Sequence, residues 1–138
     1  MKRRAPPHVI LVVDDDDDFR GLTAKSLRAF GYTVVEAADG GAAIEQARAI
    51  LPRAILLDLE MPQIDGCAVA RMLKEDASTS RIPIVAFSGS SGSERARALA
   101  SGCEAFLEKP AASEVIAAVV ARVIASGARD RGDPSSAL

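Results

Sequence analysis

The sequence predicts an α/β fold in which five parallel strands alternate with five helices. Short apolar runs rich in valine and isoleucine recur along the chain, and their unbroken hydrophobicity is typical of strands buried on both faces. Between these runs, apolar residues recur every three or four positions, which is the period of an amphipathic helix. Strand–helix alternation with short connections favours parallel pairing, right-handed crossovers and helices on both faces of one sheet.

The elements follow one another in a regular order. We expect strands at Val9–Asp14, Thr33–Ala37, Arg53–Asp58, Ile82–Ser88 and Cys103–Glu108. The helices between and after them are indicated by five apolar stripes: Phe19, Leu22, Leu27 and Phe30; Ala43, Ile44, Ala47, Ile50 and Leu51; Val69, Met72 and Leu73; Ala96, Leu99 and Ala100; and Val115, Ile116, Val119, Val120, Val123 and Ile124. A stripe of this kind marks the helix face that packs on a core.

The helix ends carry signals of their own. Gly31 and Gly102 stand where a C′ glycine ends the first and fourth helices, and Pro52 closes the second. Ser91 and Glu94 have the capping-box spacing that starts the fourth helix. The punctuation therefore agrees with the periodicity.

Length and composition fit a single globular domain. The chain has 138 residues, of which 49% are hydrophobic and 26% charged, and we expect a domain at residues 8–125 between loose tails at 1–7 and 126–138. The formal net charge of −2 indicates neither a nucleic-acid nor a membrane surface, and no targeting segment is recognised, so we expect a cytoplasmic protein. Cys67 and Cys103 have no partner at metal-ligand spacing, which excludes a structural zinc site.

Polar side chains stand at the ends of four of the five strands. The first strand ends in Asp14–Asp15, the third in Asp58 and the fourth in Ser88, and the fifth runs into Lys109. Because open α/β sheets bind ligands beyond the carboxyl ends of their strands, these side chains are expected to converge there. The second strand, which ends in Glu36–Ala37, adds nothing obvious.

The converging groups suit phosphoryl transfer. Three carboxylates cannot stay ionised together without a cation, and oxygen ligands with room for water and phosphate favour Mg²⁺. An aspartate could then attack as nucleophile while Lys109 and Ser88 stabilise the phosphoryl oxygens. Each signal is weak alone, since an acidic run at a helix start is usually a solvated cap. Their coincidence at four strand ends favours the functional interpretation.

With these residues identified, the chain resembles the receiver domains of response regulators in two-component signalling, from about Val9 to Ala125. The resemblance rests on "ILVVDD" at Ile10–Asp15, "LLDLEMPQIDG" at Leu56–Gly66, Ser88 at the end of the fourth strand, and "FLEKP" at Phe106–Pro110. It implies a flavodoxin-like, doubly wound (βα)5 sheet of strand order 2-1-3-4-5.

The resemblance also implies a role for each acidic residue. Asp58 is then the phosphoacceptor, and Asp14, Asp15 and Asp58 hold Mg²⁺ (or Mn²⁺) together with the backbone carbonyl of Glu60. Lys109 contacts the phosphoryl group. Residues 16–18, the other three aspartates of the run, fall in the loop and first helical turn and are not expected to be ligands.

Two further roles follow from the same likeness. Ser88 and Phe106 occupy the places of the switch hydroxyl and the switch aromatic, although Phe106 could instead be a plain core residue. Pro110 suggests a cis Lys109–Pro110 bond, which would aim the lysine. Glu60 occupies a variable position that, by the resemblance, tunes how long the phosphoryl group persists.

The implied function is that of a stand-alone receiver that is not an enzyme beyond its own phosphorylation and dephosphorylation. Its partners would be a histidine kinase or histidine phosphotransfer protein and a downstream protein docking on the fourth helix, fifth strand and fifth helix, with a monomer or a phosphorylation-linked dimer as the assembly. No nucleic-acid-binding element follows the fifth helix.

Two alternatives remain open, and a third is excluded. An unphosphorylated pseudo-receiver is disfavoured because every chemical position is filled. A phosphohydrolase with an aspartyl nucleophile would need a second aspartate where Glu60 stands. A calcium loop is excluded because Phe19 replaces its glycine and Lys25 its bidentate glutamate.

Overall fold

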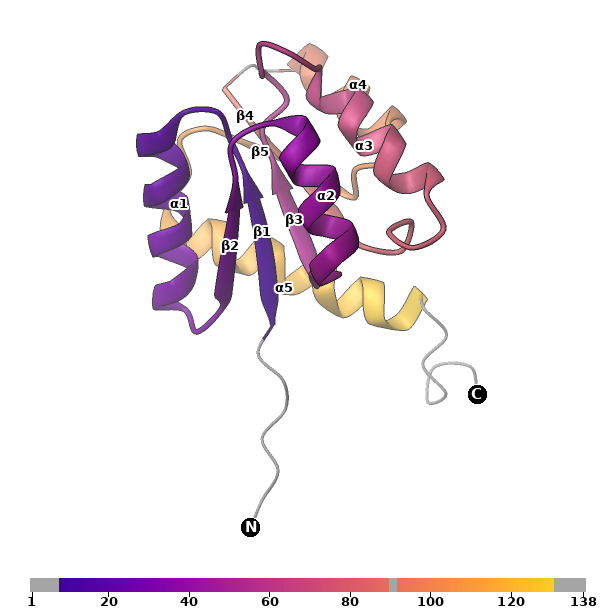
Figure 1. Ribbon diagram of the computed structural model, residues 1–138. Coiled ribbons are helices and arrows are strands. Elements are labelled where there is room, and N and C mark those ends of the chain that lie inside the picture. Colours follow the sequence, from indigo (N-terminus) through magenta and orange to yellow (C-terminus); the bar gives the residue numbers. More distant parts are fainter. Residues whose placement is uncertain (1–7, 90–91, 131–138) are drawn as a thin grey trace.

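The protein is built around one parallel sheet with helices on both faces (Figure 1). The computed structural model describes residues 8–89 and 92–130. The five strands lie in the order β2-β1-β3-β4-β5, so the expected fold class and strand order are confirmed. The elements are β1 (Val9–Val13), α1 (Asp17–Ala29), β2 (Thr33–Ala37), α2 (Gly40–Ile50), β3 (Ala54–Leu57), α3 (Gly66–Glu75), β4 (Ile84–Ser88), α4 (Gly92–Ala100), β5 (Ala105–Glu108) and α5 (Ser113–Asp130).

Some boundaries differ from those expected. The strand β4 begins at Ile84, two residues later than predicted, because Pro83 has no N–H to donate and only its carbonyl takes part, accepting from Ile55. The helix α5 continues to Asp130, past the domain boundary expected at residue 125. The tail expected at 1–7, residues 131–138 of the tail expected at 126–138, and the expected capping residue Ser91 lie outside the described residues.

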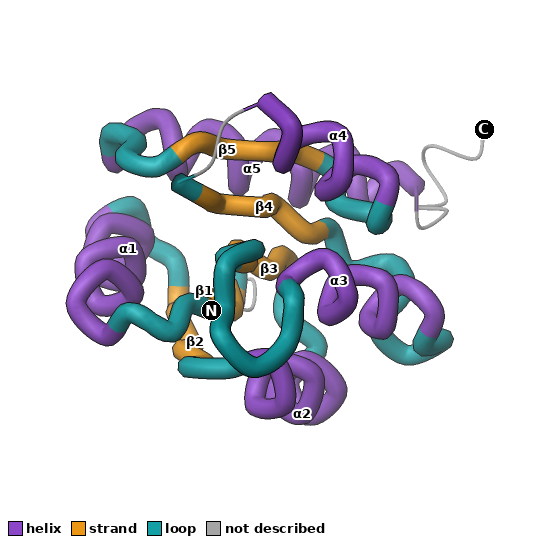
Figure 2. Tube along the Cα trace, turned by 90° about the horizontal axis from the view of Figure 1, so that it is seen from above, coloured by secondary structure: helices purple, strands orange, loops and turns teal. Residues whose placement is uncertain are grey.

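The sheet separates two hydrophobic cores. Successive side chains of a strand point to opposite faces. On β1, Leu11 and Val13 enter the core formed with α2, α3 and α4, whereas Ile10 and Val12 enter the core formed with α1 and α5. Seen from above, α2 and α3 lie along one side of the sheet and α1 along the other (Figure 2). The inner strands β1, β3 and β4 are therefore buried on both faces, as their continuous hydrophobicity predicted, whereas the edge strands β2 and β5 are only partly buried.

The prediction of which helix residues face the core was partly wrong. Leu22 of α1 is 64% exposed and Leu99 of α4 is 46% exposed, while Ala24 and Ala98 on the same helices are fully buried. Small side chains let a helix backbone approach the sheet closely, so alanine takes the inward positions and the larger residues face outward. Seven more stripe residues are exposed: Phe30, Ile50, Leu51, Met72, Ala96, Ala100 and Val115. The whole fourth stripe thus faces outward, and Ala98 is the residue that faces the core instead.

Aspartates and glycines bracket several helices. Asp16, Asp39 and Asp65 are N-caps, each with a side-chain oxygen accepting a backbone N–H from the first turn. Gly31 and Gly102 have positive φ, as their C′ positions predicted. The aspartate caps lie at the carboxyl edge of the sheet, where their helices begin, and the two glycines lie at the opposite edge, where α1 and α4 end.

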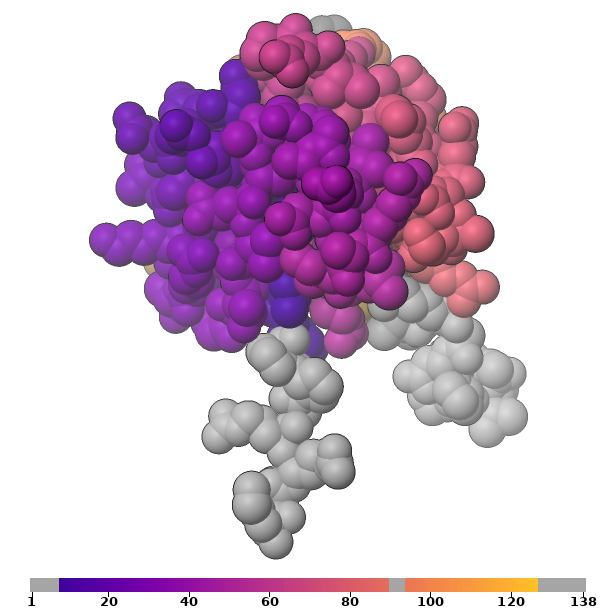
Figure 3. Space-filling view, in the orientation of Figure 1, coloured from indigo at the N-terminus to yellow at the C-terminus, as the bar shows by residue number. Residues whose placement is uncertain are grey.

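The packed helices close over the sheet. In the space-filling view, the face over α2 is continuous, and the sheet is hidden behind it (Figure 3). Within the described part of the chain, none of the helices combines the length and the apolar character that crossing a bilayer requires.

Candidate functional site

Three carboxylates meet at the carboxyl edge of the sheet. Asp14 follows β1 and is 3% exposed, Asp58 follows β3 and is 5% exposed, and Asp15 is open to solvent. One oxygen from each lies within 4.8 Å of the others. Sequence reasoning thus grouped these residues correctly, because β1 and β3 are neighbours in the sheet.

Backbone hydrogen bonds hold the two buried carboxylates in place. The Asp14 N–H donates to the Ala37 carbonyl at 3.1 Å and the Asp58 N–H donates to the Val13 carbonyl at 2.9 Å, which continues the sheet pairing by one residue. Each carboxylate then accepts a backbone N–H two residues on, from Asp16 to Asp14 and from Glu60 to Asp58, both at 3.0 Å. One oxygen of each side chain is therefore fixed, and the other faces the centre of the site.

Lys109 supplies the positive charge. Its Nζ lies 2.8 Å from Asp14 Oδ2 and 3.7 Å from Asp58 Oδ2, and its side chain is 16% exposed. The Lys109 N–H donates to the Ser88 carbonyl at 2.8 Å, which ties the residue to the end of β4. The Lys109–Pro110 bond is cis, the isomer expected from the sequence.

The protonation of Asp58 reflects its surroundings. The pKa of Asp58 is raised to about 6, chiefly by burial and also by the nearby Asp14 carboxylate, against the lowering effects of the Glu60 N–H and the Lys109 ammonium. Because the ionised form of Asp58 is disfavoured by burial and by Asp14, a cation bound beside it would stabilise that ionised form. The donor set, oxygen only and partly open to solvent through Asp15, fits a hard divalent ion such as Mg²⁺.

The two expected switch residues lie on neighbouring strands. Ser88 is fully buried at the end of β4, and its Oγ lies 3.4 Å from Glu94 Oε1 on α4. Phe106 on β5 is half-buried against the core under α2, α3 and α4, with the Arg95 guanidinium 5.4 Å above its ring. Their roles in switching remain predictions. The position of the Glu60 carbonyl as a ligand also remains one.

An ion-pair network that the sequence did not indicate joins α4 to α3. Arg97 donates to Glu94 at 3.0 Å and to Asp65, the N-cap of α3, at 2.6 Å. Glu94 thereby connects the Ser88 hydroxyl with the start of α3. The residues involved lie up to 32 positions apart, so no local spacing signals the contact.

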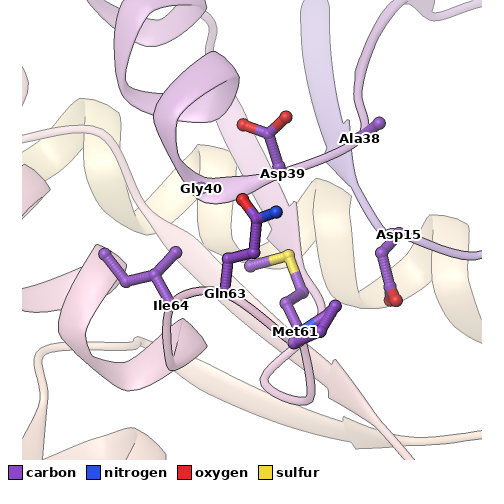
Figure 4. A pocket seen from close by; sticks show the side chains of 8 residues that line it. Asp15, Ala38, Asp39, Gly40, Met61, Gln63 and Ile64 are labelled. Carbon is purple, nitrogen blue, oxygen red and sulfur yellow. The ribbon is translucent and has the colours of Figure 1, made fainter.

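A cavity of about 200 Å³ adjoins the acidic cluster on the side of α2 (Figure 4). Met61 and Ile64 form its apolar part, and Asp15, Asp39 and Gln63 contribute polar atoms. The loop after β2 therefore lines this adjoining cavity, although it adds no residue to the cluster of Asp14, Asp15 and Asp58. The contribution to the cavity comes from Asp39, three residues beyond Glu36.

Aromatic and basic side chains around Lys109 also escaped sequence analysis. Phe19, assigned only to a helix stripe, lies under the Lys109 ammonium together with Phe87. Arg20 donates to the Asp14 carbonyl at 2.8 Å and pairs with Glu36 at 3.0 Å, which links α1 to β1 and β2. The only sequence signal for either residue was its place directly after the acidic run.

Comparison with known proteins identifies the family. A model of the response regulator receiver domain matches residues 10–121, most of the chain. The chain belongs to the response regulator receiver family. The resemblance inferred from the motifs is thus confirmed, and the fold and the acidic cluster belong to a domain of two-component signalling.

Curated relatives include response regulators of two kinds. Response regulator PleD of Caulobacter vibrioides is 45% identical over 92 residues, which is 66% of this chain and 20% of PleD. The polar-differentiation response regulator DivK of Brucella anthropi is 34% identical over 87 residues, covering 61% of this chain and 69% of DivK. The match thus spans about a fifth of the larger relative and most of the smaller one.

Solved structures match most of the receiver domain. Chemotaxis protein CheY4 of Vibrio cholerae aligns with a TM-score of 0.81 at 25% identity, covering 86% of this chain and 99% of CheY4. The receiver domain of the sensor histidine kinase PA1611 from Pseudomonas aeruginosa aligns with a TM-score of 0.81 at 28% identity, covering 87% and 99%. The latter holds a magnesium ion in its active site cleft.

Proposed function

We propose that this receiver is a phosphorylation switch in which Asp58 accepts one phosphoryl group in a Mg²⁺-dependent step. The observation that carries the proposal is the buried Asp58 carboxylate, with Asp14, Asp15 and Lys109 around it at the carboxyl edge of the sheet. The magnesium ion reported in the related receiver domain of PA1611 supports the same assignment of the metal.

The chain's own residues divide the chemistry. Asp58 attacks the phosphorus with one carboxylate oxygen, the bond from phosphorus to the donor's nitrogen or oxygen breaks, and the donor leaves with that electron pair. Asp14, Asp15 and Asp58 would hold Mg²⁺ (or Mn²⁺) together with the carbonyl of Glu60, and the ion would offset the charge of the phosphoryl oxygens. The Lys109 ammonium lies close enough to Asp58 to pair with the phosphoryl oxygens.

Signalling then passes to a partner surface. Ser88 turns toward the phosphoryl group and Phe106 follows, which alters the face of α4, β5 and α5. Leu99 on α4 and Val115 on α5 are exposed apolar side chains available for docking. The phosphodonor is a histidine kinase or histidine phosphotransfer protein, and no external substrate is turned over.

The test is intact-mass spectrometry after incubation with acetyl phosphate, with and without Mg²⁺. The expected result is a gain of one phosphoryl group that requires Mg²⁺, disappears in Asp58→Ala, and falls at least tenfold in rate in Asp15→Asn. Asp18→Asn removes an exposed carboxylate of the same acidic run and should react like the parent protein.

Two other outcomes would contradict the proposal. No phosphoryl gain under any condition would leave a pseudo-receiver that works by binding alone. Release of phosphate from many equivalents of a stable phosphomonoester would indicate a phosphohydrolase instead.

A further inference from the structure

The ammonium of Lys109 has an aromatic partner as well as acidic ones. Its Nζ lies 4.4 Å from the ring centroid of Phe19 and 5.7 Å from that of Phe87. A cation within about 6 Å of an aromatic face is attracted by the ring quadrupole. Lys109 is thus held from two directions, by the carboxylates of Asp14 and Asp58 and by two phenylalanine rings.

The Phe19 ring is fixed by its own contacts. Its backbone N–H donates to the side chain of Asp16, the N-cap of α1, at 3.1 Å. Its ring packs on buried Phe87 with centroids 5.5 Å apart and planes tilted by 53°. The start of α1 therefore presents the ring to Lys109 in a defined position.

The carboxylate partner of Lys109 is the one that a metal would also use. Asp14 Oδ1 accepts the Asp16 N–H, and Asp14 Oδ2 accepts from Lys109. A divalent ion bound to Asp14 would compete with Lys109 for that oxygen and would repel the ammonium. The attraction between the Lys109 ammonium and the Phe19 ring involves no carboxylate, so it remains when a metal ion takes the Asp14 oxygen.

We propose that Phe19 is a positioning residue whose ring face keeps the Lys109 ammonium beside Asp58 while Asp14 holds the metal. The inference rests on the proposed function for the identity of the metal and of the phosphoacceptor. It adds a residue outside the group of acidic, hydroxyl and lysine side chains, and it assigns a role to Asp16 as the cap that orients Phe19.

The first test needs no phosphorylation. Protons of the Lys109 methylene next to Nζ, observed by carbon–proton NMR, should be shifted upfield by the ring current of Phe19. The shift should persist when Mg²⁺ saturates the protein and should collapse in Phe19→Leu. If Mg²⁺ removes the shift from the parent protein, the ring does not hold the lysine and the proposal fails.

The second test changes the ring's electrostatics at nearly constant shape. Mono-, di- and trifluorinated phenylalanine at position 19 should slow phosphorylation by acetyl phosphate stepwise, by about threefold to tenfold across the series, as the ring quadrupole weakens. The matched series at Phe30, an exposed residue at the far end of α1, should give a flat response. Phe19→Trp should retain the parent rate, because its ring face is at least as attractive.

The two proposals fail in different ways. Equal rates across the Phe19 series, in a protein that is phosphorylated normally, would leave Phe19 as a packing residue and the switch intact. A protein that is never phosphorylated would sink the switch, while the ring-current measurement would still decide whether Phe19 holds Lys109. Thermal unfolding of each variant checks that the fold is retained.

Discussion

The five consecutive aspartates after β1 have different surroundings. Asp14 is buried and ion-paired, Asp16 caps α1, and Asp17 pairs with Arg20 at 2.8 Å. Asp15 is exposed but reaches the acidic cluster, and Asp18 is exposed on the first turn of the helix. A run of like charges is thus divided by one turn of backbone into a cluster, a cap and a solvated face.

The raised pKa of Asp58 has a consequence for stability in metal-free protein. An ordinary aspartate in the unfolded chain titrates near 3.8, whereas burial raises the pKa in the folded protein to about 6. Because the folded pKa is the higher one, this group's contribution is fully present below about pH 4 and is lost as the pH rises through 6. In Asp58→Asn the side chain no longer ionises, so the folded protein does not lose this stability as the pH rises.

We therefore expect Asp58→Asn to be more stable than the parent protein at pH 7.5, by about 1–3 kcal/mol, and to differ little near pH 4. Urea unfolding in chelator from pH 4 to 8 would measure the difference. Asp18→Asn, exposed in the same run, should give no such pH-dependent gain. A difference that stayed constant with pH would contradict the assigned cause.

At the scale of elements, the close approach of α3 to the loop after β3 requires glycine. A Cβ on Gly66 would lie 2.5 Å from both the Asp58 carbonyl oxygen and the Leu59 Cα, and both are backbone atoms that cannot turn aside. The loop that carries Asp58 would have to move. Gly21 in α1 offers the contrast, because a Cβ there meets no atom within 4 Å.

Gly66→Ala is expected to cost about 1–3 kcal/mol of unfolding free energy and to weaken Mg²⁺ binding at least tenfold. Gly21→Ala should stabilise the protein by about 0.5–1 kcal/mol, as alanine is the better helix former, with Mg²⁺ affinity unchanged. Urea unfolding and titration calorimetry would measure both quantities. Unaltered Mg²⁺ affinity in Gly66→Ala would show that the loop tolerates the side chain.

The elements also mark how far sequence reasoning reached. All five strands and the residues at their carboxyl ends could be predicted, because unbroken Val/Ile runs and their polar termini are local features. The inward face of α4 could not, since burial of Ala98 rather than Leu99 depends on how closely the helix approaches the sheet. The convergence of Lys109 and the carboxylates on one edge of the sheet was expected from the strand ends, whereas the pairing of Lys109 with Asp14 and its contact with the Phe19 ring depend on three-dimensional packing.

At the scale of the whole molecule, the sheet acts as a wall between two cores. Val69 on α3 belongs to one core, and Val120 on α5 belongs to the other. Each is almost completely buried, so replacement by alanine should cost about 1.5–3 kcal/mol. Because the two share no core, the costs are expected to add within about 0.3–0.5 kcal/mol.

For comparison, a second pair of substitutions is taken from a single core. Val69→Ala and Leu73→Ala, one helical turn apart on α3, should deviate from additivity by about 0.5 kcal/mol or more. Urea unfolding of the single and double variants would measure both couplings. Strong coupling of Val69 with Val120 would mean that the sheet transmits packing changes and does not isolate the cores.

The pairing of Lys109 with Asp14 spans 95 positions of the chain. On the ribosome, both buried aspartates emerge long before the lysine, so a growing chain carries the acidic pair without its counter-charge. Only when β5 and the residue after it have left the exit tunnel can the charge balance of the site be completed. Among the residues of the acidic site, the order of synthesis therefore makes the lysine counter-charge the last to become available.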